Sequence, residues 1–386
     1  MLCRSIAAGT NPGHWYRPTM VDVLIVAGAR PNFMKVKPVL DAVEDLGLST
    51  LLVHTGQHYD ERMSDVFFTE LDLRPPDRSL EVGSGSHATQ TAAVMTAMES
   101  LIDEVSPRAV VVAGDVNSTV AAAIVAAKAG CIVAHVEAGL RSRDWTMPEE
   151  INRVVTDRVS DLLLAPSPDA VENLRREGYR DDQVVLVGNV MVDTLLTNLD
   201  RALDRPVIAA LGLEPGGYVL VTLHRPANVD DDAVLGDLLD VLDDVAADLP
   251  VVFPAHPRTL ARLGSQAMVD RIHLLEPQGY LDFVALQAGA ACVLTDSGGV
   301  QEETTVLGVP CLTLRDNTER PITISDGTNR LVGHHPGTVL AAYREVRADP
   351  PAARHPELWD GKAGLRCAEA ISAVLGDPSW RRPTDV

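Results

Sequence analysis

Carboxylates stand directly after apolar runs in the first half of the chain, where a parallel sheet would present catalytic side chains. Asp115 follows AVVVAG, Glu137 follows IVAHV, and Glu149 opens a helical stretch at MPEEINR. Asp115 could cap the next helix, but Asn117 and Ser118 lie closer to its start and are adequate caps. Acids that reach one cleft would raise one another's pKa values, as acid–base chemistry near neutrality requires.

Glu137 and Glu149 also have structural interpretations. Glu137 and Arg141 would form a buried ion pair in one of them, and His135, two residues earlier, would be a satisfied core histidine. Acids in the first turn of a helix, such as Glu149 and Glu150, are favoured by the helix dipole whatever the function. The residue pattern leaves these interpretations open.

A phosphate-binding element stands in the second half of the chain. In TDSGGVQEE, Ser297, Gly298 and Gly299 lie where a strand turns into a helix. Bare backbone N–H groups and a hydroxyl can cradle a phosphate there. Glu303, one turn further on, can accept hydrogen bonds from the two hydroxyls of a ribose. The alternative is a tight strand–helix turn with an acid that the dipole favours.

Basic residues follow other apolar runs. His224 and His256 each end a strand with an arginine close by. This fits a pyrophosphate clamp better than a metal site, because no acid stands at ligand spacing beside them. Arg30 and Lys35 lie at the first strand–helix turn, where they either converge on an anion or remain solvated. The late polar loops TERP, which contains Arg320, and GTNR are placed to line the same cleft.

A donor-rich loop, HTGQHYD, follows the second predicted strand. Gln57 and His58 in this loop suggest a polar ligand, although a capped turn would have the same composition. Neither half of the chain has G-x-G-x-x-G after its first strand, and the P-loop pattern G-x-x-x-x-G-K-[ST] is missing. The usual signatures of NAD-dependent oxidoreduction and ATP hydrolysis are therefore lacking, and we expect no cofactor and no metal.

Alternating strands and helices must position these residues. The alternation predicts an α/β fold of two Rossmann-like doubly wound domains, which face each other across a cleft. The carboxyl ends of parallel strands line such a cleft. The predicted strands are 21–29, 49–56, 108–115, 131–139, 161–167 and 184–189, then 218–225, 250–258, 271–277, 291–299 and 309–314, and a closing helix covers about 361–375.

The same pattern predicts the domain limits. The N-terminal domain is expected over 20–197, a hinge over 198–217 and the C-terminal domain over 218–364. A closing helix and tail follow over 365–386. Residues 1–19 precede a second methionine and are expected to be a disordered extension.

Composition narrows the classes of function. The chain has 386 residues and a formal net charge of −21, which repels nucleic acid and anionic lipid. A bound phosphate must therefore be held by a local positive pocket. The cysteines lie far apart without a C-x-x-C pair, which fits a reducing cytosol without disulfides or structural zinc. No apolar run approaches 18 residues and no signal peptide is visible, so we expect a cytoplasmic protein.

Together the motifs resemble one family, the bacterial UDP-N-acetylglucosamine 2-epimerases of the non-hydrolysing kind. Their fold looks like that of GT-B glycosyltransferases. The resemblance runs from about Asp22 to Leu375 and rests on GARPNFMK, HTGQHYD, GDVNST, HVEAGLRS, MPEEINR, VGNVMVDTL, TLHR, AHPR, TDSGGVQEE, TERP and GTNRLVG, all in order.

The resemblance implies roles for individual residues. The positions that match those holding UDP or its phosphates are Arg30, Lys35, His224, Ser297, Gly298, Gly299 and Glu303. Phe283 matches a residue near the uracil. Asp115, Glu137 and Glu149 match the acids required for catalysis, and His224 would absorb charge on the departing UDP.

The implied reaction is reversible epimerisation at C2 of a UDP-N-acetylhexosamine. UDP leaves C1 as the C2 proton is removed, and the 2-acetamidoglucal is reprotonated on its other face as UDP re-adds. The resemblance also implies a homodimer. The alternatives are a hydrolysing epimerase that releases N-acetylmannosamine and UDP, and a GT-B glycosyltransferase. The retained acids disfavour a non-catalytic sensor of sugar nucleotides.

One departure from the family pattern concerns a loop. Many members read HRREN where this chain reads HRPAN over 224–228. In some members UDP-N-acetylglucosamine also binds beside the active site and activates the reverse reaction, and Gln57 and His58 match that neighbourhood. Pro226 and Ala227 offer fewer polar contacts than the residues they replace. We therefore expect weak or no dependence on this activator.

Overall fold

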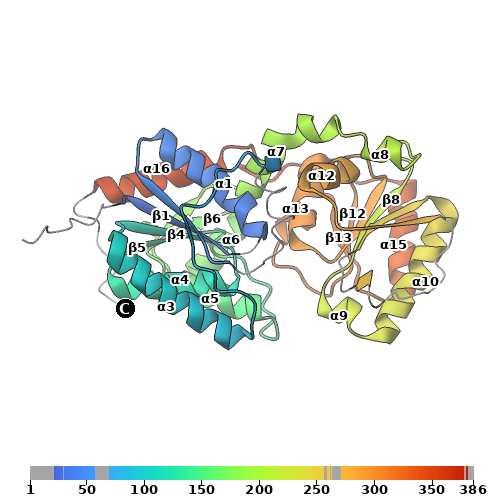
Figure 1. Ribbon diagram of the computed structural model, residues 1–386. Coiled ribbons are helices and arrows are strands. Elements are labelled where there is room, and N and C mark those ends of the chain that lie inside the picture. Colours follow the sequence, from blue (N-terminus) through green and yellow to red (C-terminus); the bar gives the residue numbers. More distant parts are fainter. Residues whose placement is uncertain are drawn as a thin grey trace, which may run out of the picture.

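Two parallel sheets form the two halves of the molecule and lie side by side, each surrounded by helices (Figure 1). The computed structural model describes residues 21–28, 30–56, 69–255, 259–260, 262, 271–377 and 380. The seven-stranded sheet has the order β3 (Arg78–Ser79), β2 (Thr50–His54), β1 (Val23–Ala27), β4 (Ala109–Ala113), β5 (Ile132–Val136), β6 (Leu162–Ala165), β7 (Val184–Leu186). The six-stranded sheet has the order β10 (Ile272–Leu275), β9 (Val251–Pro254), β8 (Val219–Thr222), β11 (Cys292–Thr295), β12 (Cys311–Thr313), β13 (Asn329–Leu331).

Helices connect these strands. Those of the first half are α1 (Arg30–Asp45), α3 (His87–Val105), α4 (Asn117–Ala129), α5 (Pro148–Val159), α6 (Pro168–Arg176) and α7 (Val190–Leu203). The others are α8 (Val207–Ala210), α9 (Pro226–Val229), α10 (Asp232–Asp248), α12 (Tyr280–Ala288), α13 (Gly298–Leu307), α14 (Ile322–Ser325), α15 (Pro336–Ala348) and α16 (Ala363–Gly376).

The central strands are apolar throughout because helices cover both faces of each sheet. Strand β1 reads VLIVA and all of its residues are buried. Val23 and Ile25 belong to the same core cluster as residues of α1 and α16. Leu24 and Val26, which point the opposite way, belong to the cluster of α3 and α4. The side chains of this one strand therefore alternate between two separate hydrophobic cores.

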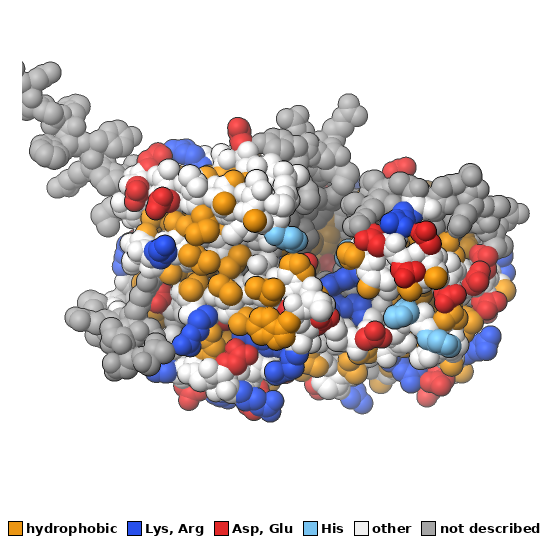
Figure 2. Space-filling model, turned by 90° about the horizontal axis from the view of Figure 1, so that it is seen from below, with side chains coloured by type: hydrophobic (Ala, Val, Ile, Leu, Met, Phe, Trp, Pro, Cys, Tyr) orange, Lys and Arg blue, Asp and Glu red, His pale blue; other side chains and the backbone are white. Residues whose placement is uncertain are grey.

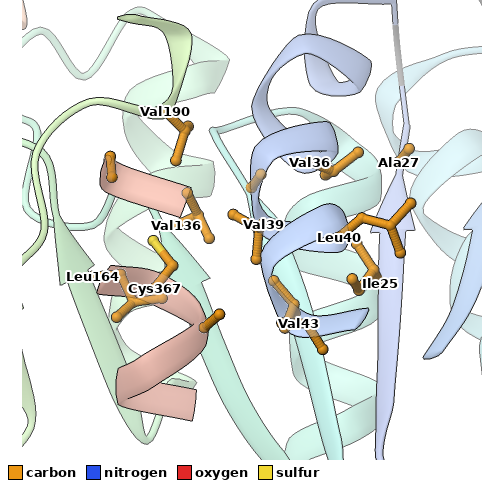
Figure 3. Packing of buried hydrophobic residues seen from close by; sticks show 14 of the residues in the cluster. Ile25, Ala27, Val36, Val39, Leu40, Val43, Val136, Leu164, Val190 and Cys367 are labelled. Carbon is orange, nitrogen blue, oxygen red and sulfur yellow. The ribbon is translucent and has the colours of Figure 1, made fainter. Parts of the chain in front are cut away.

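The last helix returns to the N-terminal half, where α16 packs beside α1 (Figures 1 and 3). Cys367 lies in one cluster with Val39 and Val43 of α1. Asp193 of α7 accepts hydrogen bonds from the first backbone N–H groups of α16, at 3.1 Å from Ala363 and 2.7 Å from Gly364. The closing helix therefore completes the core of the first domain rather than that of the second.

The fold class predicted from the sequence is confirmed: the chain is α/β, with two parallel doubly wound sheets. Two strands were not predicted. Strand β3 is a short exposed pair of residues, and β13 lies within GTNRLVG, which was expected to be a polar loop. That expectation is wrong because Asn329 pairs with β12 and accepts a hydrogen bond from Thr313 at 2.6 Å. In the segment 198–217, α7 continues to Leu203, and α8 follows; the domain limits stay a prediction.

The contact of α16 with α1 leads to a stability prediction. A Cβ at Gly364 would lie 2.8 Å from the Cβ of Pro38 and closer still to the Pro38 carbonyl, whereas Gly376 has open space. Gly364→Ala should therefore destabilise the protein by about 1–3 kcal/mol through overpacking. Gly376→Ala, at the other end of the helix, is the matched control and should be close to neutral. Urea unfolding of both variants tests this, and equal stabilities would contradict it.

Candidate active site

Each sheet has one switch point, at which the strand order reverses. The strands end there on the side that faces the other domain. In the first sheet this point lies between β1 and β4, and in the second between β8 and β11. Ligands of doubly wound folds bind at such points. A cavity of about 270 Å³ lies here, and both domains line it: Met34, Lys35, Met191, Gln278, Tyr280, Phe283, Ser297, Gly299, Val300, Glu302, Glu303 and Arg320. Figure 2 shows Lys and Arg side chains gathered in the crevice between the domains.

The cavity holds six of the residues predicted from the sequence, namely Lys35, Phe283, Ser297, Gly299, Glu303 and Arg320. A larger hollow of about 740 Å³, lined by residues between Ile324 and Arg354, contains none of them. We therefore place the candidate site in the smaller cavity, although the larger hollow offers more space.

The start of α13 forms one wall. Ser297 is the N-cap, but its side chain makes no capping hydrogen bond. The N–H groups of the first turn therefore have no competing side-chain cap, and Ser297, Gly299 and Val300 line the cavity, as an anion site would require. Gly298 must be glycine, because a Cβ would lie 2.6 Å from Arg320 Nη1 and 2.7 Å from Glu319 Oε1. The strand–helix turn predicted here is present, and its helix N-terminus packs tightly on Arg320; its phosphate-binding role stays a prediction.

Glu303 lies deeper in the same helix and is buried. Its Oε2 accepts a hydrogen bond of 2.6 Å from Gln287. Burial raises the pKa of Glu303 to about 7, despite the hydrogen bonds from Gln287 and Tyr280, which lower it. A polar ligand that donates two hydrogen bonds to the carboxylate would stabilise its charged form and so offset the effect of burial on this pKa.

Lys35 and Glu137 meet on the opposite wall. Lys35 Nζ, on α1, lies 2.5 Å from Glu137 Oε2, and both side chains are buried. Glu137 has a left-handed backbone with φ of 70°, which a residue with a side chain adopts only under strain. Its Oε1 is buried and has no hydrogen-bond partner among the described residues. A Cβ at Gly114 would lie 2.8 Å from Lys35 Nζ, so this close approach requires glycine.

Asp115 forms an ion pair with Arg153, which also binds Glu150. Burial raises the pKa of Asp115, but Arg153 and Lys35 outweigh it, and the net shift is downward. The expectation that the acids would raise one another's pKa values is therefore wrong for Asp115. Its closest charged neighbours are cations, so it remains ionised near neutrality.

His135 is a satisfied core histidine. Its Nδ1 lies 2.6 Å from Asp157 Oδ1, and its Nε2 lies 2.9 Å from the Gly114 carbonyl oxygen. Arg141 pairs with Asp157 at 2.7 Å and with Glu177 at 2.6 Å. The buried Glu137–Arg141 pair, the structural interpretation of Glu137, therefore does not form, and His135 holds the turn that leads to Asp115.

The two acids at the start of α5 differ in their surroundings. Glu150 is buried and accepts hydrogen bonds from the backbone of Ser142 at 2.9 Å and of Arg143 at 2.8 Å. Glu149 is half-buried and, within the described part of the chain, forms no hydrogen bond. It interacts electrostatically with Arg225 across the cleft. Glu150 is thus the structural acid of this pair, and Glu149 is the one available to a ligand.

Asp296 orients His224 at the end of β8. His224 Nδ1 lies 2.8 Å from Asp296 Oδ1, and the His224 side chain is 50% exposed. Asp296 is fully buried and also accepts hydrogen bonds from the backbone of Arg225 and from Asn228. The arrangement fixes one ring nitrogen, as in sites where a carboxylate aligns a histidine, and leaves half of the side chain exposed.

Several of these residues had no function predicted from the sequence. Arg153, Asp296, Glu302 and Glu319 stood inside quoted motifs without a function. Glu319 is buried and pairs with Arg320 and with Arg315, at 2.8 Å in the second case. These cations hold the pKa of Glu319 far below its usual value although burial opposes them. A buried acid between two arginines in RDNTER was the signal that could have revealed it.

Some predictions lie outside the described residues. They concern the side chain of Arg30, His256, and the pair Gln57 and His58. Within the described ranges, no cluster of acids, histidines and cysteines could hold a metal ion. The helices in those ranges are also too short or too polar to cross a membrane.

The fold and the cleft define a class: a two-domain α/β protein of GT-B-like architecture, with a helix N-terminus and buried carboxylates at a cavity between the domains. Comparison with known proteins identifies the family. Residues 41–372 match the family model described as UDP-N-acetylglucosamine 2-epimerase. The chain belongs to the UDP-N-acetylglucosamine 2-epimerase family and is an epimerase.

Three similarities support this assignment. The UDP-N-acetylglucosamine 2-epimerase of Methanocaldococcus jannaschii is 40% identical over 90% of this chain and 98% of its own. A crystal structure from that organism, in complex with UDP-GlcNAc and UDP, matches with a TM-score of 0.85 over 91% of this chain and 99% of that one. The UDP-2,3-diacetamido-2,3-dideoxy-D-glucuronate 2-epimerase of Pseudomonas aeruginosa is 41% identical over 92% of this chain and 100% of its own.

The burial of Glu303 leads to a prediction of pH-dependent stability. Its pKa in the folded protein, about 7, lies above the usual 4.5, so its ionisation weakens the fold as pH rises through this interval. Without ligand, Glu303→Gln should be more stable than the wild type at pH 8 by up to about 3 kcal/mol. The difference should shrink toward zero at pH 5.

Urea unfolding at both pH values measures this difference. Glu150→Gln is the matched control: the pKa of Glu150 is lowered, because its hydrogen bonds and Arg153 outweigh burial, so this variant should lose stability at pH 8. A Glu303→Gln effect of equal size at pH 5 and pH 8 would contradict the assignment of a buried, ionising carboxylate.

Proposed function

We propose that this enzyme interconverts UDP-N-acetylglucosamine and UDP-N-acetylmannosamine by elimination and re-addition of UDP through a 2-acetamidoglucal intermediate. The observation that carries the proposal is a cavity that both domains line. The start of α13, in the proposal the site for the leaving diphosphate, lines one cavity with Lys35, and Lys35 in turn lies 2.5 Å from Glu137. The family supplies the substrate class, since its relatives are named for UDP-sugars epimerised at C2.

In this proposal, residues of the C-terminal domain bind the leaving group and stabilise its charge. As the C1–O bond breaks, the electron pair stays on the diphosphate. The N–H groups at the start of α13 and the outward nitrogen of His224 stabilise that charge. Ser297 and Arg320 line the same wall, and Glu303 binds the ribose hydroxyls. In the proposal, Arg30 and His256 extend this set, Phe283 lies near the uracil, and Gly298 and Gly299 let the diphosphate approach.

In the same proposal, acids of the N-terminal domain remove and return the proton at C2. Epimerisation needs one group to remove the C2 proton from one face and a group to return a proton to the other. Glu137 offers a buried oxygen without a protein partner among the described residues, and Asp115 stays ionised beside Arg153. Glu149 is half-buried and interacts electrostatically with Arg225 of the other domain. We assign proton transfer at C2 to these three acids.

Heavy-water NMR tests this reaction directly. With UDP-N-acetylglucosamine in D₂O, we expect deuterium at C2 and an equilibrium mixture of two UDP-sugars with little free UDP. Stoichiometric UDP with free N-acetylmannosamine would select the hydrolysing reaction instead. Turnover only after addition of an acceptor, without exchange at C2, would select a glycosyltransferase. The diacetamido-glucuronate substrate in the name of the Pseudomonas relative serves as a second substrate in the same assay.

The acids provide a second test. Positioned acid–base groups contribute roughly 10²–10⁴-fold in rate, or about 3–5 kcal/mol of barrier. Asp115→Asn, Glu137→Gln and Glu149→Gln should each lose turnover on that scale while circular dichroism shows a folded protein. Asp181→Asn, at a side chain that is 82% exposed, is the control and should keep wild-type turnover. Near-native turnover of any of the three would show that its residue has no role in proton transfer.

A further inference from the structure

Helix α12 forms part of the cavity wall, and it begins without a capping side chain of its own. Tyr280 and Phe283, both near its start, line the cavity. Its N-cap is Gly279, which has no side chain to accept a hydrogen bond from the first turn. The first N–H groups of a helix have no partner within the helix, so they need an acceptor from elsewhere.

The acceptor comes from the first half of the chain. Glu70, which stands shortly before β3 of the first sheet, accepts a hydrogen bond of 2.6 Å from the Tyr280 N–H through its Oε2. The Leu281 N–H donates to the same oxygen at 3.4 Å. A Cβ at Gly279 would lie 2.7 Å from Glu70 Oε1, and the three atoms nearest to it all belong to the Glu70 carboxyl group. The carboxylate therefore occupies the space that a side chain at the N-cap would fill.

Glu70 is itself held in place by α7. Its carbonyl oxygen accepts a hydrogen bond of 2.9 Å from Arg201 Nη1. Leu281 and Val284 of α12 belong to the same core cluster as Leu195 of α7, and the two helices lie side by side (Figure 1). Helix α12 connects β10 and β11 of the second sheet. Its start is therefore fastened to the first half of the molecule, while the strands on either side of it belong to the second.

We propose that Glu70 is a positioning residue of this site, whose carboxylate caps α12 across the domain junction and so holds Tyr280 and Phe283 where UDP binds. The role rests on the proposed function, in which Phe283 lies near the uracil. A carboxylate suits this position because it accepts strong hydrogen bonds and meets the positive end of the helix dipole. Glu70 itself forms no bond to the nucleotide and takes no proton from C2.

UDP binding, measured by calorimetry, tests this role without an assay of turnover. In Glu70→Ala the first turn of α12 loses its acceptor, so UDP must order that turn as it binds. We expect the Kd of UDP to rise by about 3- to 30-fold, the range that corresponds to loss of a helix cap. Glu70→Gln keeps an acceptor oxygen and should bind UDP within about threefold of the wild type. KM should rise with Kd while kcat changes by less than about twofold, because substrate and transition state lose the same contact.

A double-mutant cycle tests whether the effect passes through this cap. Gly279→Ala places a methyl group where the Glu70 carboxylate lies, so it should also raise the Kd of UDP. Once Glu70→Ala has removed that carboxylate, the space is open and Gly279→Ala should have no further effect. We therefore expect the double variant to bind UDP as well as Glu70→Ala does. Losses that add would show that Glu70 acts elsewhere than at this cap and would overturn the proposal.

Asp193→Ala is the matched control, because Asp193 also caps a helix from a distant segment, α16, in the core of the first domain. It should lose stability and keep the Kd of UDP within about twofold of the wild type. A rise of equal size in both variants would overturn the role of Glu70, because Kd would then follow stability alone.

The wild type separates this proposal from the proposed function. A wild type that does not bind UDP would overturn both together, whereas a wild-type Kd in Glu70→Ala would overturn the role of Glu70 alone. If Glu70→Ala does not fold, Gly279→Ala decides by the same criterion, because it displaces the carboxylate without removing it.

Discussion

The structure depends on a balance of buried charge at the junction of the two domains. The whole chain carries −21, whereas the proposed function requires its cleft to accept a diphosphate. Glu319 makes this possible, because it gathers Arg315 and Arg320 at a point where neither could be buried alone. Arg320 then lies against Gly298 at the start of α13. Two arginine side chains are thus buried beside an acid inside an acidic protein, and one of them lies at the start of α13.

In the N-terminal domain the roles of the charges are reversed, because here cations stabilise buried carboxylates. Lys35 and Arg153 keep carboxylates in a buried site, one beside Glu137 and one beside Asp115. The fold brings these pairs together because the ends of β1, β4 and β5 are neighbours in the sheet. Strain at Glu137, which has φ of 70°, is tolerated because the surrounding sheet leaves its backbone no other path. Glu137 and Asp115 therefore each have a cation that offsets the cost of removing their charge from water.

The sequence predicted the fold well because its strands are apolar and stand directly before the polar motifs. It also predicted that Lys35, Ser297 and Glu303 bind one ligand, and these three residues line one cavity. It did not separate Glu149 from Glu150, since both are acids in the same first turn, and only their contacts distinguish them. It missed Glu319 although its partners Arg315 and Arg320 stand beside it in RDNTER, because the motif does not show that the acid is buried. It missed Arg153 because its partner Asp115 comes from a distant segment. The lowered pKa of Asp115 escaped for the same reason: periodicity shows which face a residue occupies, not which charge will lie opposite.

The return of α16 to the first domain has a consequence for biosynthesis. The helix that fills the core beside α1 follows every strand of the second sheet in the sequence. Domains generally fold as they leave the ribosome, N-terminal first. Here the N-terminal domain cannot complete its core until the strands of the second sheet and α16 have been translated, so the C-terminal domain is free to fold before it. The first domain to be made is the last to be finished, and until then its groove for α16 is an apolar surface that chaperones would have to shield.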